Sequence, residues 1–250
     1  MHGYAPITDG ESVTQVSKTV DNALSLLHLL GETGSATAVE LSRMTGLSRT
    51  VVHRSLVTME RQGFTRRQGS TYSLGFAILR LADGIEPDIR DAARPGLERL
   101  ATTFDATSVL VVADGPEGVI LDEFVSQSGP AQLRYSVGFR SSLTVGSHGR
   151  VILAFSEAPV VEAAIAHLAD EAGARNLHSQ LEQIRDAGHA FSTDEVRSGV
   201  SGLAAPVLDR HGRAMASIGV VTLSGRFPQP NDVAQALKEV AAQVADRLMR

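Results

Sequence analysis

Cysteine and tryptophan are absent from the 250-residue sequence, and aromatic residues make up only 4% of it. The absence of cysteine excludes disulfide bonds, thiolate metal ligands and cysteine nucleophiles. The scarcity of aromatic side chains argues against recognition of RNA or single strands by base stacking. No run of about 18 apolar residues occurs, and the N-terminus lacks the apolar stretch of a signal peptide. We therefore expect a soluble, cytoplasmic protein that does not associate with membranes.

The signatures of enzymes and metal sites are missing as well. Eight histidines are present, but none forms a His-x₃-His pair, and His167, His178 and His189 lack an accompanying carboxylate pattern. The sequence has no nucleophile elbow, phosphate-binding glycine loop or dinucleotide fingerprint. These absences predict a protein that is not an enzyme and that uses no metal and no cofactor. An enzyme-like C-terminal domain with an accessory N-terminal domain is the less favoured alternative.

Charge is distributed unevenly along the chain. The first 80 residues carry 8 Lys and Arg against 6 Asp and Glu, a net charge of +2. Residues 81–250 carry 15 against 22, a net charge of −7, so the overall value of −5 hides a basic N-terminal part. A chain of this length has room for two modest domains. The pattern therefore predicts two domains, the first of which faces a phosphate-bearing partner.

Helical periodicity dominates the N-terminal part after a tail, residues 1–13, that we expect to be flexible. Apolar residues from Val16 to Leu30 follow one face of a helix of about four turns. Thr37-Ala-Val-Glu40 then has the form of a capping box, in which a hydroxyl and a carboxylate satisfy backbone donors at a helix start. We expect the short helix that follows to bury Leu41 and Met44 and to end at a glycine.

A third helix is predicted directly after this glycine-containing turn, and together with the second it has the form of a helix-turn-helix. Ser48 is a favourable N-cap, and Val52, Leu56 and Met59 lie on one helical face. Two short helices joined by a tight glycine-containing turn are typical of a helix-turn-helix. The next residues, 64–74, predict a small hairpin with a glycine in its turn, which would form a wing.

The outer face of the third helix and the wing carry the candidate DNA contacts. The early turns of a recognition helix are the ones that reach base edges in the major groove, where Arg suits guanine and Ser, Thr and His suit bases or phosphates. An ordinary solvated helix face is the alternative, which the agreement of caps, turn, wing and local charge disfavours. The candidate DNA-binding residues are Ser48, Arg49, Thr50, His53, Arg54, Arg66 and Arg67.

The acidic part mixes helical and strand patterns. We expect an apolar helix at 75–83 that links the two parts and touches a second subunit, and a helix over Ala93–Phe104 that starts close to Pro95 or is kinked there. Strands are expected at 108–113, 119–125, 203–208 and 214–221, with a weaker one at 133–137, and further helices at 149–155, 159–168, 179–187 and from Asn231 onward. This order favours an α+β domain with helices packed on a single sheet.

Both parts resemble one family of proteins. The stretches "VSKTVDNALSLLHLLGE", "ATAVELSRMTGLSRTVVHRSLVTMERQGF" and "YSLG" are similar to the winged helix-turn-helix of the IclR family of bacterial transcriptional regulators. "LRYSVGFRSSLTVGSHGRVILAF" and "LEQIRDAGHAFSTDEVRSGVSGLAAPVLDRHGRAMASIGVV" are similar to its effector-binding domain. The resemblance covers about residues 15–250 and finds two unrelated domains in the expected order.

The resemblance implies a fold, partners and domain limits. The fold class is α+β, with an N-terminal winged helix-turn-helix joined by a helix to a GAF-like effector-binding domain. The limits are 14–75 for the DNA-binding domain, 76–91 for the linker helix region and 92–250 for the effector-binding domain. The implied partners are double-stranded operator DNA, a small-molecule effector and further copies of the chain, as a homodimer and as a dimer of dimers.

The resemblance also implies an effector pocket on the sheet, closed by the loop before a "GR" helix. Its positions are Leu133, Ser147, His148, Ser192, Gly202, Gly219 and Val221. Family members that bind small organic acids place a carboxylate, a thiol and hydroxyls at the last four positions, where this chain has Ser, Gly, Gly and Val. We therefore expect a larger, partly apolar effector, with any anionic group near the amides of Ser147 and His148.

Several alternatives stay open at this site. Ser147 and His148 can merely cap the following helix, and the two glycines can serve close packing in a collapsed pocket. In that case the regulator acts constitutively or through a protein partner. Arg140 is expected to form a structural salt bridge rather than a ligand clamp, and Asp194 and Glu195 to be solvated or paired with Arg197.

Overall fold

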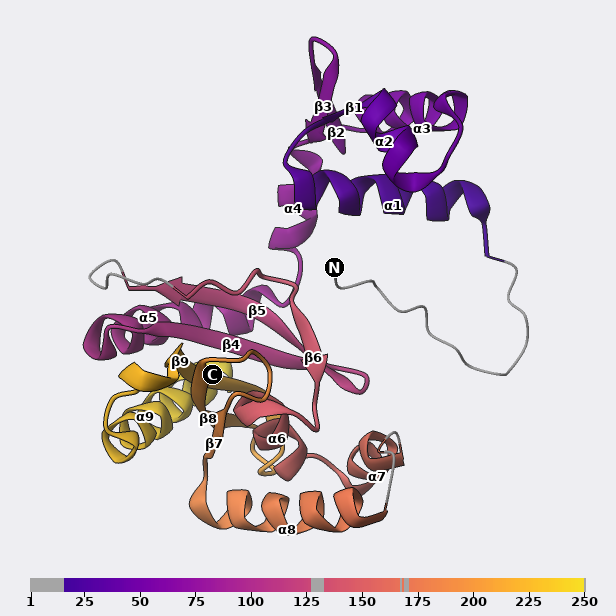
Figure 1. Ribbon diagram of the computed structural model, residues 1–250. Helices are drawn as coiled ribbons and strands as arrows, with labels where there is room; N and C mark the ends of the chain where they lie inside the picture. The colour runs from indigo at the N-terminus through magenta and orange to yellow at the C-terminus, as the bar shows by residue number, and fades with distance from the viewer. Residues whose placement is uncertain (1–15, 127–132, 167, 169–170, 250) are drawn as a thin grey trace. The chain divides into compact units, whose positions relative to one another are not determined.

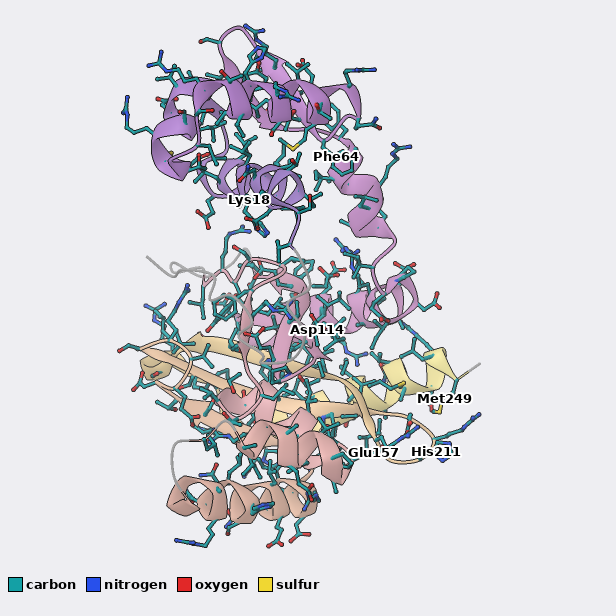
Figure 2. All side chains as sticks on the ribbon, turned by 90° about the vertical axis from the view of Figure 1, so that its right-hand side faces the viewer. Lys18, Phe64, Asp114, Glu157, His211 and Met249 are labelled. Carbon is teal, nitrogen blue, oxygen red and sulfur yellow. The ribbon has the colours of Figure 1, made fainter. Side chains whose placement is uncertain are left out.

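The computed structural model describes residues 16–126, 133–166, 168 and 171–249 (Figure 1). The chain divides into two compact units, one ending at Ile85 and the other beginning at Glu86. Each has a hydrophobic core of its own, and Figure 2 shows the side chains that fill the space between its elements.

The first unit consists of a helical core with a small antiparallel sheet. Its elements are α1 (Lys18–Thr33), β1 (Ala36–Thr37), α2 (Ala38–Thr45), α3 (Arg49–Arg61), β2 (Thr65–Gln68), β3 (Thr71–Leu74) and α4 (Ala77–Asp83). The strands pair in the order β1-β3-β2. Its core is built from fully or nearly buried side chains of the helices and of β3: Leu26, Leu30, Leu41, Val52, Leu56, Met59 and Tyr72.

The caps predicted for this unit are present. Thr37 Oγ1 accepts a hydrogen bond from the Glu40 amide at 3.2 Å, and Glu40 Oε2 accepts one from the Thr37 amide at 2.8 Å. Gly46 ends α2 at a positive φ of 72°, and Ser48 caps α3. The prediction that Met44 is buried is wrong, because its side chain is 55% exposed and Leu47, in the turn, packs against the core instead.

The second unit is built on one antiparallel sheet in the order β6-β5-β4-β9-β8-β7. Its strands are β4 (Thr107–Asp114), β5 (Glu117–Val125), β6 (Arg140–Ser142), β7 (Ala190–Thr193), β8 (Val200–Leu208) and β9 (Ala214–Leu223). Its helices are α5 (Pro87–Phe104), α6 (Gly146–Ala154), α7 (Ala158–Ala166), α8 (Glu171–Ala187) and α9 (Pro230–Leu248), with a 3₁₀ turn, η1 (Ser224–Arg226).

Strand alternation divides the core of this unit into two layers. Leu110 of β4 packs with α5 and α9 on one face of the sheet, while its neighbours Val109 and Val111 pack with α6, α7 and α8 on the other. On β9 the same alternation places Val220 on the α5–α9 side and Val221 on the α6 side. The row of β9 residues on the α6 side leads into the candidate site.

Some sequence predictions for this unit are wrong. Residues 133–137 form no strand, because the Tyr135 amide donates to the Glu123 carboxylate at 2.9 Å rather than to a neighbouring strand. Strand β6 lies further along the chain, and β7 was not predicted. Helix α5 begins at Pro87 and runs through Pro95, so a start at Pro95 is excluded.

No helix in the described parts of the chain is long and apolar enough to cross a membrane.

Candidate functional site

The outer face of α3 is one candidate site. Val52, Leu56 and Met59 face the core, and Ser48 accepts a hydrogen bond from the Val51 amide, so the helix begins where the sequence predicts. Because the buried residues take the inner face, a polar set is left exposed on the first two turns. The set is Ser48, Arg49, Thr50, His53 and Arg54, and the structure brings all of it together.

The wing that follows α3 is the predicted hairpin of β2 and β3. Both of its arginines are exposed and held by contacts within this unit. Arg66 donates from Nε to Ser73 Oγ at 3.1 Å, and its guanidinium lies 5.0 Å from the centre of the Phe76 ring. Arg67 donates from Nε to the Gly69 carbonyl at 2.8 Å. The hairpin therefore presents two arginines whose orientation is already restricted.

The second candidate site is a pocket between the sheet and α6. The lining is mostly aliphatic and aromatic, with a few hydroxyls and one guanidinium, and the cavity measures about 50 Å³. The lining residues are Val109, Val111, Ile120, Tyr135, Phe139, Ser141, Val145, Gly146, Ser147, His148, Ser192, Val196, Arg197, Val200, Gly202 and Val221. An apolar concavity with a small number of polar groups is the usual form of a small-molecule site.

The structure brings five of the seven predicted effector positions into this lining: Ser147, His148, Ser192, Gly202 and Val221. Leu133 lies outside the lining and packs against the core on the α6 side of the sheet. Gly219 lies beneath the His148 ring, and a Cβ atom there would be 2.6 Å from both Cε1 and Nε2 of that ring. The glycine at 219 therefore makes room for His148 and does not enlarge the cavity as expected.

The expected anionic subsite at the start of α6 is already taken by the protein itself. Ser147 and His148 lie in the first turn of the helix, not in a loop before it. The Gly146 amide donates to Glu195 Oε2 at 3.1 Å, and the Ser147 amide donates to Ser192 Oγ at 3.0 Å. A carboxylate of the chain thus lies where positive helix-end charge would attract a ligand anion.

Glu195 makes a second contact that corrects the sequence interpretation. Its Oε1 accepts a hydrogen bond from Arg150 at 2.6 Å, so its salt bridge is with Arg150 and not with Arg197. Arg140 pairs with Asp114 and with Glu117, the latter at 2.7 Å, which confirms its predicted structural role. These two carboxylates raise the pKa of the Arg140 guanidinium further above its ordinary value.

His148 is a partly buried titratable group of the pocket. Its Nδ1 lies 2.9 Å from Ser217 Oγ on β9. Burial lowers the pKa of the imidazole to about 4, so it is neutral at pH 7. Its Nε2 is buried and has no hydrogen-bond partner among the described residues.

Arg197 and Tyr135 form a part of the pocket that the sequence did not identify. The Arg197 guanidinium lies 5.1 Å from the centre of the Tyr135 ring and is exposed at the rim. Burial raises the pKa of the Tyr135 hydroxyl, and the nearby Arg197 charge opposes that rise. Tyr135 belongs to the segment mistaken for a strand, which explains why its inward orientation was missed.

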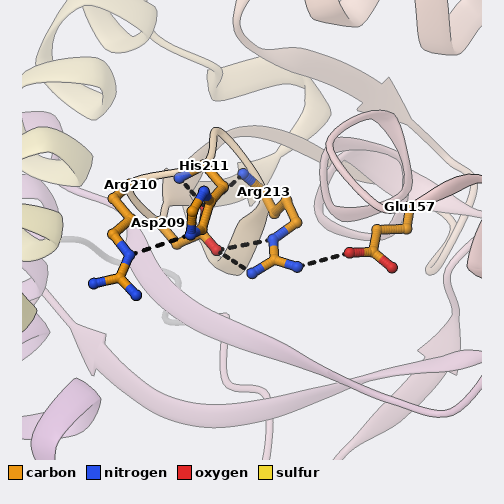
Figure 3. A network of polar contacts seen from close by, with 5 residues as sticks. All are labelled: Glu157, Asp209, Arg210, His211 and Arg213. Atoms are coloured by element: carbon orange, nitrogen blue, oxygen red, sulfur yellow. Dashed lines mark hydrogen bonds and ion pairs between the residues drawn. The ribbon is translucent and has the colours of Figure 1, made fainter.

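A third cluster of polar side chains stabilises the fold and does not line either candidate site. In the hairpin between β8 and β9, Asp209 Oδ1 accepts from the amides of His211 at 2.8 Å and Arg213 at 2.9 Å (Figure 3). Arg213 also pairs with Glu157 at 2.6 Å. These contacts keep the pKa of Asp209 below its ordinary value and fix the turn between the two strands.

Two family models match the chain. The model described as the bacterial transcriptional regulator IclR C-terminal domain matches residues 85–246, and the IclR helix-turn-helix domain matches residues 19–69. The HTH-type transcriptional regulator KipR of Bacillus subtilis is 28% identical over 244 residues, covering 93% of this chain and 97% of KipR. The HTH-type transcriptional regulator XynR of Escherichia coli is 26% identical over 224 residues, covering 84% and 88%.

Solved structures share the fold. The Thermotoga maritima IclR structure superposes with a TM-score of 0.78 at 22% identity and covers 93% of this chain and 99% of that one. An IclR homologue from Microbacterium hydrocarbonoxydans, solved in complex with 4-hydroxybenzoate, gives a TM-score of 0.77 at 20% identity and covers 91% and 99%.

Proposed function

Because this chain belongs to the IclR family of bacterial transcriptional regulators, we propose that it binds operator DNA through α3 and the wing, and that a small molecule in the pocket modulates this binding. The family match confirms three predictions made from the sequence. The chain is a transcriptional regulator, its fold is of the α+β class, and a helix-turn-helix domain precedes the C-terminal domain. The family consists of transcriptional regulators, not of enzymes.

The observation that carries DNA binding is the polarity of α3. Its first two turns expose five polar side chains while the opposite face is buried, so the helix can enter a major groove without disturbing the core. Arg49 and Arg54 suit guanine edges, and Ser48, Thr50 and His53 suit bases or phosphates.

The wing supports the same proposal. Arg66 and Arg67 extend the positive surface beyond α3, and their contacts along the hairpin reduce the rotamer freedom that is lost on binding. We assign them to phosphate or minor-groove contacts, which contribute affinity and distinguish at most A·T from G·C base pairs.

Selection from a pool of random double-stranded DNA tests this assignment. The wild-type chain should enrich one sequence and bind it at least about 10³-fold more tightly than a scrambled duplex of equal length. The Arg49→Ala/Arg54→Ala variant should lose most of that ratio. Arg61→Ala is the matched control, because it removes a charge from the last turn of the same helix. Equal loss in the control would contradict recognition by the first turns.

The pocket supports a role in binding an effector. We assign ligand contact to Ser147, His148, Ser192, Gly202 and Val221, which line the cavity. We assign no ligand contact to Leu133 or Gly219. Leu133 packs against the core on the α6 side of the sheet, and Gly219 leaves room for the His148 imidazole. The lining is mainly apolar, so burial of a partly apolar ligand supplies the main free energy of binding.

A regulator with a closed pocket is the second candidate, and one observation favours it. The cavity holds only about 50 Å³, which is little more than a few water molecules occupy. A thermal-shift screen of small metabolites separates the two proposals. A ligand present at 100 times its dissociation constant should stabilise the second unit by about 2.7 kcal/mol, and a closed pocket should give no such hit.

We also propose that the chain acts as a homodimer, and as a dimer of dimers, in the bacterial cytoplasm. Exposed apolar side chains occur on α1, at Val20 and Leu24, and on α4, at Leu79 and Leu81. Val20 and Leu24 are four residues apart and therefore share one face of α1, and exposed apolar surface of this kind supports a protein interface. Light scattering after size exclusion should give a multiple of 26.5 kDa for the wild type and a smaller mass for Leu79→Glu/Leu81→Glu.

A further inference from the structure

An exposed turn between β7 and β8 forms part of the wall of the pocket. Residues 194–199, which we call the strap, begin at Asp194 and end at Gly199, and both of these end residues have a positive φ, of 62° and 78°. The Gly199 amide donates to the Asp194 carboxylate at 2.5 Å, which closes the base of the strap. Val196 and Arg197 line the cavity although both are exposed to solvent. The strap therefore separates the cavity from solvent at these two residues.

The strongest attachment of the strap is made by Glu195. Its Oε1 accepts a hydrogen bond from Arg150 at 2.6 Å, and its Oε2 accepts one from the Gly146 amide at 3.1 Å. The Arg150 side chain is only 12% exposed and also donates to Gln180 of α8 at 3.0 Å, so its position is fixed from a second side. A charge-assisted bond to a fixed and largely buried arginine contributes more than one between mobile surface groups. Glu195 therefore joins the strap firmly to α6.

The other attachments of the strap are weaker. Arg197 Nη1 donates to the Arg134 carbonyl at 3.4 Å, and its exposed guanidinium lies over the Tyr135 ring. Val196 packs against the start of α6. Within the part of the chain that the structure describes, no backbone–backbone hydrogen bond joins the strap to α6 or to the segment that carries Tyr135. Loss of the Glu195 contacts would leave the strap held at its base and by these weaker contacts alone.

We propose that the strap is a gate of the pocket and that Glu195 is its latch. When Glu195 leaves Arg150, the strap turns outward about its base, and its two lining residues leave the wall of the cavity. A ligand can then enter, and the space of about 50 Å³ that exists with the latch closed becomes larger. This inference rests on the proposed ligand-binding function of the pocket. It assigns a positioning role to Glu195, which does not itself line the cavity.

Because the chain lacks cysteine, a single introduced thiol can test the gate without a known effector. Val221 lines the pocket and is 6% exposed, so the thiol of Val221→Cys should react with the small neutral reagent methyl methanethiosulfonate mainly when the strap opens. The rate, followed by mass spectrometry of the full-length protein, reports the population of the open state. Adding Glu195→Ala should raise the rate about tenfold or more, as loss of a hydrogen bond between charged groups predicts. Val109→Cys, also in the lining, provides a second thiol for the same measurement.

Two controls separate a gate from a general loss of stability. Val240→Cys places the thiol on α9, on the other face of the sheet, where the side chain is 1% exposed, and its rate should not change with Glu195→Ala. Glu157→Ala removes the exposed salt bridge to Arg213 in the same unit and should leave the rate of Val221→Cys unchanged. Equal acceleration at both thiols, equal acceleration by Glu157→Ala, or no acceleration at either pocket thiol would overturn the gate. The pocket assignment would remain intact, because this measurement uses no effector.

Discussion

Acid should destabilise the second unit through His148. The folded state holds the pKa of this imidazole at about 4, against an ordinary value of 6.5. Below pH 6.5 the unfolded chain therefore takes up a proton that the folded chain does not accept until about pH 4. Stability is fully present above pH 6.5 and is lost as the pH falls toward 4. At about 1.36 kcal/mol per pKa unit, the loss is about 3 kcal/mol. Typical domains have about 5–15 kcal/mol in total.

The loss of unfolding free energy can be measured by urea unfolding of the wild type and of His148→Asn. Circular dichroism would follow the unfolding at pH 7, 6, 5 and 4. Asn has no group that titrates in this range, and its amide can still bond to Ser217 from the position of Nδ1. The carboxylates titrate equally in both proteins, so the difference in unfolding free energy isolates His148. We expect that difference to fall by about 3 kcal/mol between pH 7 and 4. A difference that stays constant across the range would refute the burial argument.

Other predictions follow from the same structure. Arg54→Ala alone should weaken binding of the selected duplex by about 1–3 kcal/mol and relax specificity at one base pair, and an anisotropy titration against substituted duplexes checks this. The Arg66→Ala/Arg67→Ala variant should weaken the binding of all duplexes alike. The slope of log affinity against log salt concentration should become smaller by about 0.9 for each phosphate that the wing no longer neutralises. An unchanged slope would show that the wing stays in solvent. Gly219→Leu should destabilise the second unit by more than about 2 kcal/mol, because its Cβ would lie 2.7 Å from the Leu203 carbonyl and 2.6 Å from the buried imidazole. Wild-type stability of that variant in urea would contradict this close packing.

Local signals in the sequence predicted the first unit well. The capping box at Thr37, the N-cap at Ser48 and the buried stripe of α3 depend on residues a few positions apart, and the structure contains all of them. The strand β1 was missed because Ala36 and Thr37 are too short a segment to show alternation. The prediction that Met44 is buried was wrong because the spacing of apolar residues does not show which of two neighbouring side chains, Met44 or Leu47, packs against the core.

The pocket was harder to predict because its residues meet across long stretches of chain. The Glu195 carboxylate occupies the start of α6 from a loop far along the sequence. The fit between His148 and Gly219 likewise joins a helix to a distant strand. The resemblance supplied positions in the lining, but the side chains that fill or rim the cavity, such as Tyr135 and Arg197, depend on three-dimensional packing.

The affinity of the selected duplex, measured with and without a compound that binds the pocket, tests the central claim most directly. A regulator whose pocket communicates with its DNA-binding unit should show a change in duplex dissociation constant of about fivefold or more. Because linkage is reciprocal, the duplex should change the affinity of the compound by the same factor. Loss of binding in His148→Asn would show that a compound binds at His148. If such a compound leaves the duplex affinity of the wild type unchanged, this coupling is contradicted.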